Sequence, residues 1–282
     1  MSFRIVTDSA SDISQEMAAQ WDIKVLPLKI RFGNTEYLDG VDLTNQQFFE
    51  KLVESDTIPK TSQIPPLEYE EVFCAAEAAG EEVLCLCLSS GVSGCFQSAC
   101  IAAEDHPGVT VIDTRQFCIS ELVIVEYAVE CRRQGLSCAE TAENIRSVLD
   151  RVHVIAMFDT LEYLKLGGRL SSAGALAGAL LSLKPVLTID EGVVRVIGKA
   201  RGSRSGNNLL RESVEKMGGI DFSMPVCLGY TGFSDELLKK YVDDSAYLYE
   251  GYEDHLKTVS VGACIGTYAG PGAIAFAFFT QI

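Results

Sequence analysis

The chain has 282 residues, of which 48% are hydrophobic, and its formal net charge is −16. This length is enough for one large domain or for two domains of ordinary size, each with a sizeable core. The acidic balance is unfavourable for contact with a nucleic-acid backbone, so no nucleic-acid partner is expected.

Helix and strand signals alternate over residues 1–152, which predicts a parallel sheet covered by helices on both faces. Residues 61–66 are expected to form an ordered polar loop between Pro59 and the next helix. The predicted strands of this half are 3–6, 25–32, 83–88 and 109–112. The predicted helices are 12–20, one beginning after Thr44, 67–79, one after Gly94, 119–134 and 138–150.

Residues 153–282 mix strand pairs with helices, so we predict a second, α+β domain after a boundary near residue 152. Helix 171–183 is apolar on nearly all sides, which fits either a packed core helix or a wall against an apolar ligand. The predicted strands are 153–158, 185–189, 193–200, 226–231, 259–264 and 274–279. The predicted helices are 160–165, 171–183, 207–217 and 235–243.

The cysteines and the apolar stretches indicate the setting of the protein. Ten cysteines are present and none forms a C-x-x-C pair, which is typical of a reduced protein without a zinc ribbon or disulfide framework. The N-terminal residues include Arg4, Asp8 and Asp12, unlike a signal peptide. The longest apolar stretches, 173–181 and 273–279, are too short to span a bilayer. We therefore expect a cytoplasmic protein.

The segment Val83–Cys100 is the most informative part of the chain. A predicted strand ends at Leu88, the small polar residues 89–94 follow, and a helix comes next. The free N–H groups at such a helix start attract an anion, and Gly91 and Gly94 allow a ligand to approach the backbone. An ordinary turn with a capping serine explains the same pattern.

Serine hydrolase chemistry is weakly supported. Residues 91–95 approach the G-x-S-x-G elbow, but Cys95 replaces its last glycine. The histidines, His106, His153 and His255, have no evident link to Ser93.

Cofactor and metal motifs are also incomplete. No G-x-G-x-x-G follows a strand, and residues 192–199 lack the spacing of a P-loop. The carboxylates of Asp8, Asp12, Asp39 and Asp42 suit caps and turns better than metal ligation. Neither a cofactor nor a metal is expected.

Two other patterns concern ligand binding. Hydroxyl side chains gather in turns that follow strands, and these neutral donors suit an uncharged or singly charged ligand head. A run of five basic residues without an acid stands out in so acidic a chain, either as a solvated face or as a docking patch. Its members are Arg195, Lys199, Arg201, Arg204 and Arg211.

Together, these segments resemble the DegV family of fatty-acid-binding proteins, which includes the binding subunits of bacterial fatty acid kinase. The similarity extends almost from end to end, and the number and order of the motifs make it specific. The matching segments are Thr7–Ser9 (TDS), Tyr37–Leu43, Thr61–Gln63 (TSQ), Ser89–Ala99, Asp159–Ser171 (DTLEYLKLGGRLS), Lys184–Pro185 and Gly198–Gly202.

The resemblance implies a two-domain EDD fold with one long-chain fatty acid buried between the domains. It places the carboxylate at Thr61, Ser62 and Ser93 and at the backbone N–H of Gly94. It further places Arg169 and Arg201 near the head group or at a mouth that faces the kinase. The basic run adds Arg204 to this docking mouth.

One position departs from the family pattern. The family often has T-H-T-G-P-G near the C-terminus, with the histidine near the ligand head, whereas this chain has Tyr268 in that place. A tyrosine donates a hydrogen bond but does not become cationic near neutral pH. Binding of the carboxylate is compatible with this change, but a part in phosphoryl transfer is not supported.

We therefore expect a carrier without a catalytic cycle, which presents its acid to a separate fatty acid kinase subunit for acyl phosphate formation. Transient membrane contact is compatible with such a carrier. Two alternatives stay open: a lipid or ester hydrolase that uses Ser93, and a lipid sensor without a kinase partner.

Overall fold

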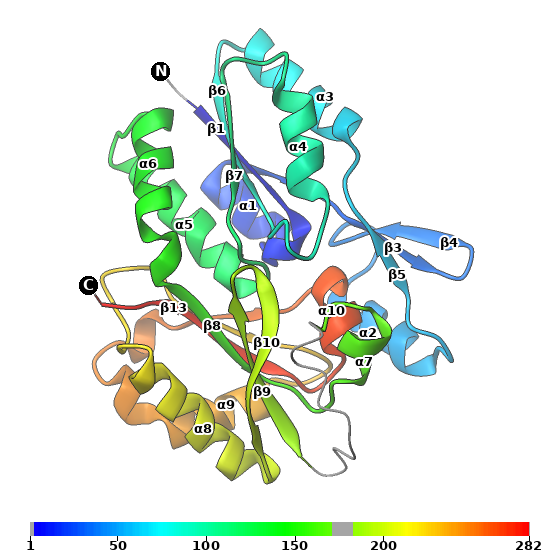
Figure 1. Ribbon diagram of the computed structural model, residues 1–282, viewed down its shortest axis with the longest axis vertical. Coiled ribbons are helices and arrows are strands. Elements are labelled where there is room, and N and C mark those ends of the chain that lie inside the picture. Colours follow the sequence, from blue (N-terminus) through cyan, green and yellow to red (C-terminus); the bar gives the residue numbers. More distant parts are fainter. Residues whose placement is uncertain (1–2, 171–182, 282) are drawn as a thin grey trace.

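The computed structural model describes residues 3–170 and 183–281 (Figure 1). Its N-terminal half contains a sheet with the strand order β2-β1-β6-β7. All three neighbouring pairs are parallel, which confirms the predicted parallel sheet. Its strands are β1 (Phe3–Asp8), β2 (Ile23–Leu26), β6 (Glu82–Cys87) and β7 (Val109–Asp113).

Helices cover both faces of this parallel sheet because alternate side chains of each strand point to opposite faces. Ile5 and Leu86 pack with the helices of one face, and Val6 and Cys85 pack with those of the other. The first face is covered by α1 (Gln15–Trp21), α5 (Ile119–Arg133) and α6 (Cys138–Val148). The second face is covered by α3 (Pro66–Ala78) and α4 (Cys95–Ala103).

The single strand predicted over residues 25–32 is wrong, because the chain divides it between two sheets. β2 ends at Leu26, and after Pro27 the chain enters a small antiparallel sheet with the order β4-β3-β5. Proline has no N–H to donate to a ladder, so a strand ends there readily. The elements of this excursion are β3 (Lys29–Phe32), β4 (Thr35–Leu38), α2 (Asn45–Glu54) and β5 (Lys60–Ser62).

The C-terminal half contains a six-stranded sheet in the order β10-β9-β8-β13-β11-β12. Only its β11–β12 pair is parallel, which confirms a mixed sheet. The strands are β8 (Val152–Met157), β9 (Lys184–Asp190), β10 (Val193–Ala200), β11 (Cys227–Tyr230), β12 (Lys257–Ser260) and β13 (Ile274–Phe279). The α-helices are α7 (Glu162–Leu166), α8 (Gly202–Lys216), α9 (Glu236–Asp244) and α10 (Ala263–Ala269). Of the 3₁₀ turns in the described residues, η1 (Ser9–Ser11) and η2 (Leu149–Arg151) belong to the N-terminal half, and η4 (Ala246–Tyr249) and η5 (Glu253–His255) to the C-terminal half.

Three other elements differ from the sequence prediction. The strand expected over 259–264 stops at Ser260, and α10 begins three residues later. The polar loop expected over 61–66 begins as strand β5, and α8 begins at Gly202 rather than at residue 207. The helix expected over 171–183 falls on residues 171–182, which lie outside the described residues.

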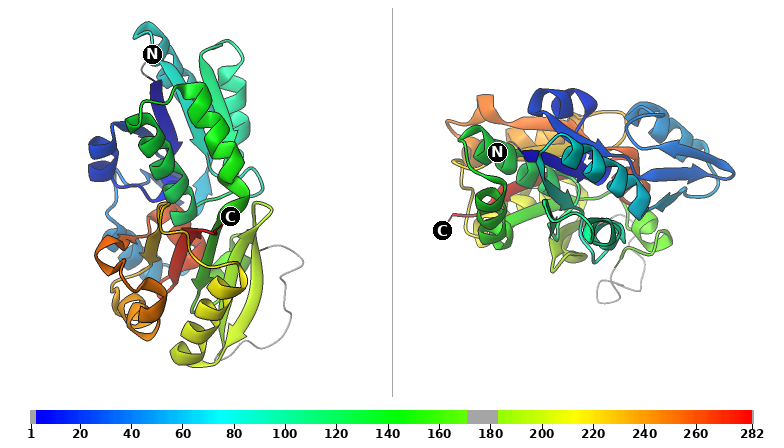
Figure 2. Two further views of the ribbon diagram at one scale, coloured as in Figure 1. Left: turned by 90° about the vertical axis from the view of Figure 1, so that its left-hand side faces the viewer. Right: turned by 90° about the horizontal axis from the view of Figure 1, so that it is seen from above.

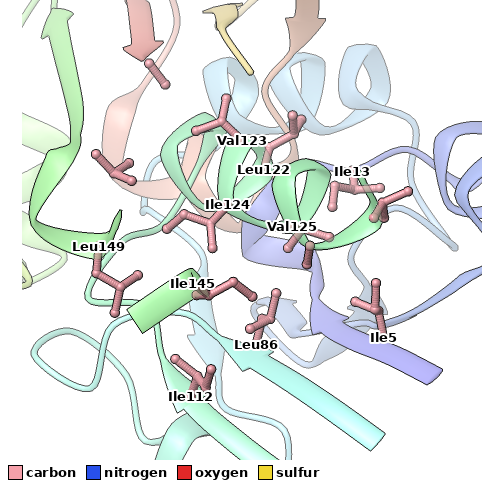
Figure 3. Close-up of a cluster of buried hydrophobic side chains, with 14 of the residues drawn as sticks. Ile5, Ile13, Leu86, Ile112, Leu122, Val123, Ile124, Val125, Ile145 and Leu149 are labelled. Atoms are coloured by element: carbon pink, nitrogen blue, oxygen red, sulfur yellow. The ribbon is translucent and has the colours of Figure 1, made fainter. Parts of the chain in front are cut away.

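Helix α5 connects the two sheets, which are stacked along the long axis of the molecule (Figure 2). One hydrophobic cluster includes Ile5 of β1, Leu122 and Val125 of α5, and Phe279 of β13 (Figure 3 shows much of it). Two separate domains would each have a core of their own, whereas this cluster contains residues of both halves. The domain boundary near residue 152 therefore stays a prediction.

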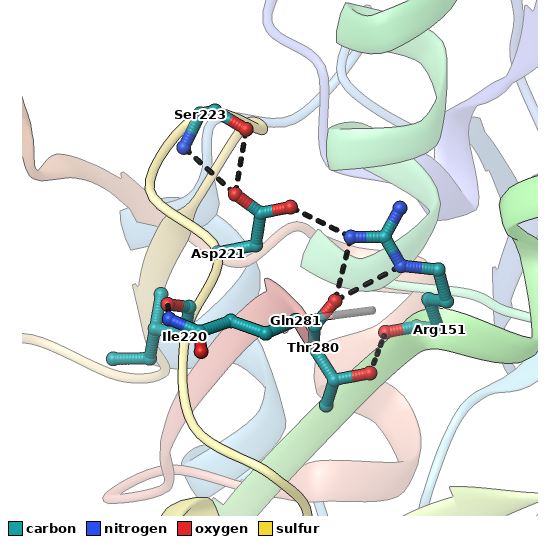
Figure 4. A network of polar contacts seen from close by, with 6 residues as sticks. All are labelled: Arg151, Ile220, Asp221, Ser223, Thr280 and Gln281. Atoms are coloured by element: carbon teal, nitrogen blue, oxygen red, sulfur yellow. Dashed lines mark hydrogen bonds and ion pairs between the residues drawn. The ribbon is translucent and has the colours of Figure 1, made fainter.

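A polar network fixes the start of β8 to the end of the chain (Figure 4). Arg151 Nη2 donates to Asp221 Oδ2 at 2.6 Å, and Arg151 Nε donates to the carbonyl of Thr280 at 2.9 Å. Burial alone would raise the pKa of Asp221, but hydrogen bonds from Ser223 and Arg151 outweigh burial and lower this pKa. The network holds β8 beside β13, its neighbour in the sheet.

Candidate functional site

Two adjacent cavities lie where the serine turn, defined as residues 89–94, faces α10. The outer cavity has a volume of about 310 Å³ and the inner cavity about 60 Å³. Both are lined by Phe117, Phe158, Ile265 and Ala269, so these side chains form the boundary that the two cavities share.

Hydroxyl groups from three separate segments line the outer cavity. Thr61 and Ser62 come from β5, Ser93 from the serine turn, and Tyr268 from α10. Thr61 Oγ1 and Tyr268 Oη are 2.5 Å apart and share a hydrogen bond. Burial raises the pKa of Tyr268, so its phenol keeps its proton at neutral pH and remains a donor.

The serine turn presents its backbone to the outer cavity. The N–H of Gly94 has no hydrogen-bond acceptor in the described chain, and it lies just before α4. Ser93 Oγ accepts the N–H of Cys95 at 3.3 Å, which fixes the hydroxyl at this helix start. A Cβ on Gly94 would lie 2.0 Å from Gln63 Oε1, so only glycine lets Gln63 pack here. The site therefore has both N–H and O–H donors for an acceptor-rich ligand.

Arg169 supplies the positive charge in the lining of the outer cavity. Its guanidinium lies 5.1 Å from the centre of the Tyr268 ring, within the range of a cation–π contact, and Arg169 Nη1 donates to the carbonyl of Gly167 at 3.0 Å. A Cβ on Gly167 would lie 2.4 Å from the Tyr268 ring. The close approach of the α7–β9 connection to α10 therefore requires glycine at this position.

Three carboxylates behind the site hold its segments in place. Asp8 Oδ2 accepts the N–H of Leu88 at 2.9 Å, directly before the serine turn. Asp12 Oδ1 accepts the N–H of Gly262 at 2.7 Å, and Asp39 Oδ1 accepts that of Ala263 at 3.1 Å, at the start of α10. The cap expected at Asp8 is confirmed, because its Oδ1 also accepts the N–H of Ala10 at 3.1 Å at the start of η1, whereas the contacts of Asp12 and Asp39 with α10 are long-range.

Burial raises the pKa of each of these three carboxyl groups. The pKa rises to about 7 for Asp8, about 8 for Asp12 and about 6 for Asp39, although backbone hydrogen bonds oppose the shift. For Asp8 and Asp12, repulsion from neighbouring carboxylates adds to the increase. The segments around the site are therefore held by groups that titrate near neutral pH.

The inner cavity is apolar and lies between α10, the mixed sheet, and Phe117 and Cys118 just before α5. Small side chains on its strands leave space, among them Ala156 of β8 and Ala275 of β13, which face each other in register. The Thr188 hydroxyl in the lining donates to the carbonyl of Val154 at 2.8 Å and so offers no donor to a ligand. This part of the cavity suits a hydrocarbon.

Groups for general-base or metal chemistry are not found at the outer cavity. Its described lining residues include no histidine, aspartate or glutamate. In the described ranges, no group of three or more histidine, cysteine, aspartate and glutamate side chains is arranged to hold a metal ion. In the same ranges, no helix is long and apolar enough to cross a membrane.

A family model described as an uncharacterised protein of the DegV family matches residues 2–281. The chain belongs to the DegV family. The DegV domain-containing protein TTE1491 of Caldanaerobacter subterraneus is 34% identical over 280 residues, with 98% of each chain covered. The resemblance seen in the sequence is therefore confirmed.

Solved DegV structures have the same fold. A DegV family protein from Thermus thermophilus, described by its fatty acid binding, matches with a TM-score of 0.90 and 30% identity, and all of both chains is covered. A stearic acid-binding protein from Eubacterium ventriosum matches with a TM-score of 0.86 and 26% identity over 99% of this chain and 98% of that one. These likenesses confirm the fold of this DegV chain.

The structure brings together most of the predicted site residues of this DegV protein. Six of them line the outer cavity: Thr61, Ser62, Ser93, Gly94, Arg169 and Tyr268. Arg201 and Arg204 are exposed at the start of α8 and are not in that lining. Sequence reasoning missed Phe117 and Phe158, although Phe158 ends one predicted strand and Phe117 follows another by five residues. That position was their one available signal.

The raised pKa of Asp12 predicts how stability depends on pH. A carboxyl group with a folded-state pKa above its unfolded value binds more protons in the native state, so stability falls as the pH rises between the two values. For Asp12 this fall lies between its ordinary pKa of 3.8 and about 8. Asp12→Asn removes this titration and keeps an oxygen for the N–H of Gly262, so we expect a weaker fall and greater stability than wild type above about pH 8.

Urea unfolding at a series of pH values measures this effect. Asp22→Asn, at the exposed end of α1, is the matched control for the loss of one carboxylate. An unchanged slope in Asp12→Asn would contradict the assignment.

Proposed function

We propose that this DegV protein binds one long-chain fatty acid, with the carboxylate at the hydroxyl groups of the outer cavity and the hydrocarbon tail extending through that cavity into the inner cavity. The observation that supports this best is the boundary that a donor-lined cavity and an apolar cavity share at Phe117 and Phe158. The fatty acid binding described for the similar Thermus thermophilus and Eubacterium ventriosum proteins supports the same ligand class.

The carboxylate would accept a hydrogen bond from the free N–H of Gly94 and one from Ser93, whose hydroxyl proton would turn from the weak acceptor Cys95 Sγ to the charged oxygen. Thr61 and Tyr268 already share one hydrogen bond, so one of the two hydroxyls retains a proton for the ligand. The hydroxyl of Ser62 would complete the set of hydroxyl donors around the carboxylate. Arg169, which is exposed, would balance the negative charge of the ligand. A single carboxylate, rather than a polyphosphate, fits a lining with one arginine.

The tail is expected to supply most of the affinity. Burial of about fourteen methylene groups gains roughly 11 kcal/mol at about 0.8 kcal/mol each, before the cost of association. A carboxylate at a helix start adds about 0.3–1 kcal/mol. The polar end therefore mainly fixes the orientation of the acid.

A hydrolase that uses Ser93 has less support. Ser93 Oγ donates to Cys95 Sγ at 3.3 Å rather than to a base. The described lining of the outer cavity contains no histidine, aspartate or glutamate that could remove the proton of Ser93. We therefore propose a carrier without a catalytic cycle of its own.

We further propose that the carrier presents its acid to a fatty acid kinase subunit in the cytoplasm. Ten free cysteines support a reducing compartment. Ala200 pairs with Lys184, and Lys184 forms an ion pair of 2.9 Å with Asp159, next to Phe158 in the cavity lining. Arg201 thus follows β10 at the edge of the sheet nearest this part of the cavity. A sensor without a kinase would use the same ligand site but not this basic edge.

Direct binding measurements test the ligand assignment. We expect solvent extraction of the purified protein to release fatty acid, and the delipidated protein to bind about one acid per chain by titration calorimetry. Ser93→Ala should weaken binding of the acid by about tenfold, because one hydrogen bond to a charged group is lost, and should affect the methyl ester less.

Ser90→Ala is the matched control because Ser90 is exposed in the same turn and does not line the outer cavity. Recovery of no lipid, together with no binding of added acid, would rule out the proposed ligand. Equal losses for acid and ester would rule out carboxylate recognition at Ser93.

The position of the tail predicts a chain-length effect. Ala156→Leu should fill part of the inner cavity and weaken binding of octadecanoic acid by about tenfold, with a smaller loss for dodecanoic acid. Ala78→Leu, on the exposed end of α3, controls for the added hydrophobic volume. If both acids lost affinity equally in Ala156→Leu, the tail would not lie in the inner cavity.

Charge reversal tests the docking edge. Arg201→Glu with Arg204→Glu should abolish capture of the kinase subunit in a pull-down while the calorimetric affinity for fatty acid stays within about twofold of wild type. Lys216→Glu, at the other end of α8, is the control. Undiminished capture by the double variant would contradict docking at this edge.

A further inference from the structure

Three side chains form a row beside α3, apart from the two cavities. Cys74 and Glu77 belong to α3, and His106 belongs to the loop before β7. Cys74 Sγ lies 3.8 Å from His106 Nε2, and His106 Nδ1 lies 2.9 Å from Glu77 Oε2. Cys74 and Glu77 are three residues apart on α3, so they lie on the same face of the helix. None of the three residues lines the outer or the inner cavity.

His106 is held rigidly between its two partners. Its residue is only 8% exposed, and its ring meets that of Phe73 edge-on, with 6.0 Å between the ring centres. The backbone around it is also fixed, since the N–H of His106 donates to the carbonyl of Ala103 at 3.0 Å. Because the Glu77 carboxylate is an acceptor only, the Nδ1–H group of His106 donates a hydrogen bond to it, and Nε2 then presents its lone pair to the Cys74 thiol.

Cys74 differs from the other cysteines in its access to solvent. It is exposed, Cys100 is partly buried, and the remaining eight are buried. Burial raises the pKa of several of the buried thiols, to about 12 for Cys95 and about 11 for Cys138, which disfavours their reactive thiolates. An exposed thiol beside a fixed imidazole is the arrangement that activates a nucleophile, with a carboxylate to orient the base.

We propose that Cys74 is a site of covalent modification, a nucleophilic thiol that reacts with peroxides, with His106 as its base and Glu77 as a positioning residue. His106 Nε2 takes the thiol proton, and the thiolate sulfur attacks one oxygen of the peroxide. The S–O bond forms as the O–O bond breaks, so sulfur is oxidised and the peroxide is reduced. With hydrogen peroxide, the leaving hydroxide takes the proton from His106, and the products are a sulfenic acid and water.

This proposal does not depend on the ligand of the cavities. Figure 1 shows α3 and α4 at one end of the molecule and α8 at the other, with α10 at middle height. The C-terminal part of α3, where Cys74 and Glu77 lie, is thus available to oxidants whether or not the cavities are filled.

Two carboxylates of α3 provide a test in which the expected effects differ in sign. Glu70 lies one turn before Cys74, and Glu77 lies about one turn after it. Loss of a nearby negative charge by itself favours the thiolate, so Glu70→Ala should leave the reaction unchanged or make it faster. Glu77→Ala should instead slow the reaction by about fivefold or more, because His106 loses the partner that orients it.

The experiment treats the intact protein with hydrogen peroxide, traps sulfenic acid with dimedone, and measures each cysteine by peptide mass spectrometry. We expect Cys74 to be labelled at least about tenfold faster than Cys100. Both carboxylates are exposed, so the two variants should fold, and far-ultraviolet circular dichroism checks this. The proposal is overturned if Cys100 reacts as fast as Cys74, or if the two variants change the rate at Cys74 in the same way.

Discussion

The candidate site depends on buried carboxylates that accept hydrogen bonds from distant backbone N–H groups. Asp8 holds the start of the serine turn, while Asp12 and Asp39 hold the start of α10. Without these contacts, neither Ser93 nor Tyr268 has a fixed position relative to the other. Asp39 Oδ2 also accepts a hydrogen bond from the Ser9 hydroxyl. The oxygen of that serine accepts the N–H of Leu28, which lies in the cavity lining. The serine turn, the start of α10 and the segment at Leu28 are therefore all held by the carboxylates of three aspartates.

The arrangement separates orientation from affinity. Donors gather at the outer cavity, where one positive charge and several hydroxyls line the wall and would meet the polar end of the proposed ligand. The inner cavity is apolar, and small residues such as Ala156 and Ala275 lie among the larger side chains of the strands that line it. Burial of hydrocarbon dominates binding energy, whereas donors decide which end of an amphiphile enters first. A carrier that must hold a lipid and still expose its reactive end to a partner benefits from this separation.

Local sequence patterns predicted the parts of the fold that local interactions determine. The parallel sheet and the serine turn follow from apolar runs and turn residues, whereas the grouping of Thr61 and Ser62 with Ser93 was expected from the family resemblance. Helix α10 was missed because the N–H groups at its start bond with carboxylates more than two hundred residues away, at Asp12 and Asp39. The aromatic boundary at Phe117 and Phe158 was missed for a related reason, since only the packed sheets bring these residues together.

The central claim is that the acid lies across both cavities with its carboxylate at the serine turn. A crystal structure of the protein with a bound long-chain fatty acid tests this most directly. We predict a carboxylate oxygen about 2.9 Å from Ser93 Oγ and from the Gly94 nitrogen, with the tail passing between Phe117 and Phe158. An acid bound elsewhere, or one whose carboxylate lies in the inner cavity, would contradict the account.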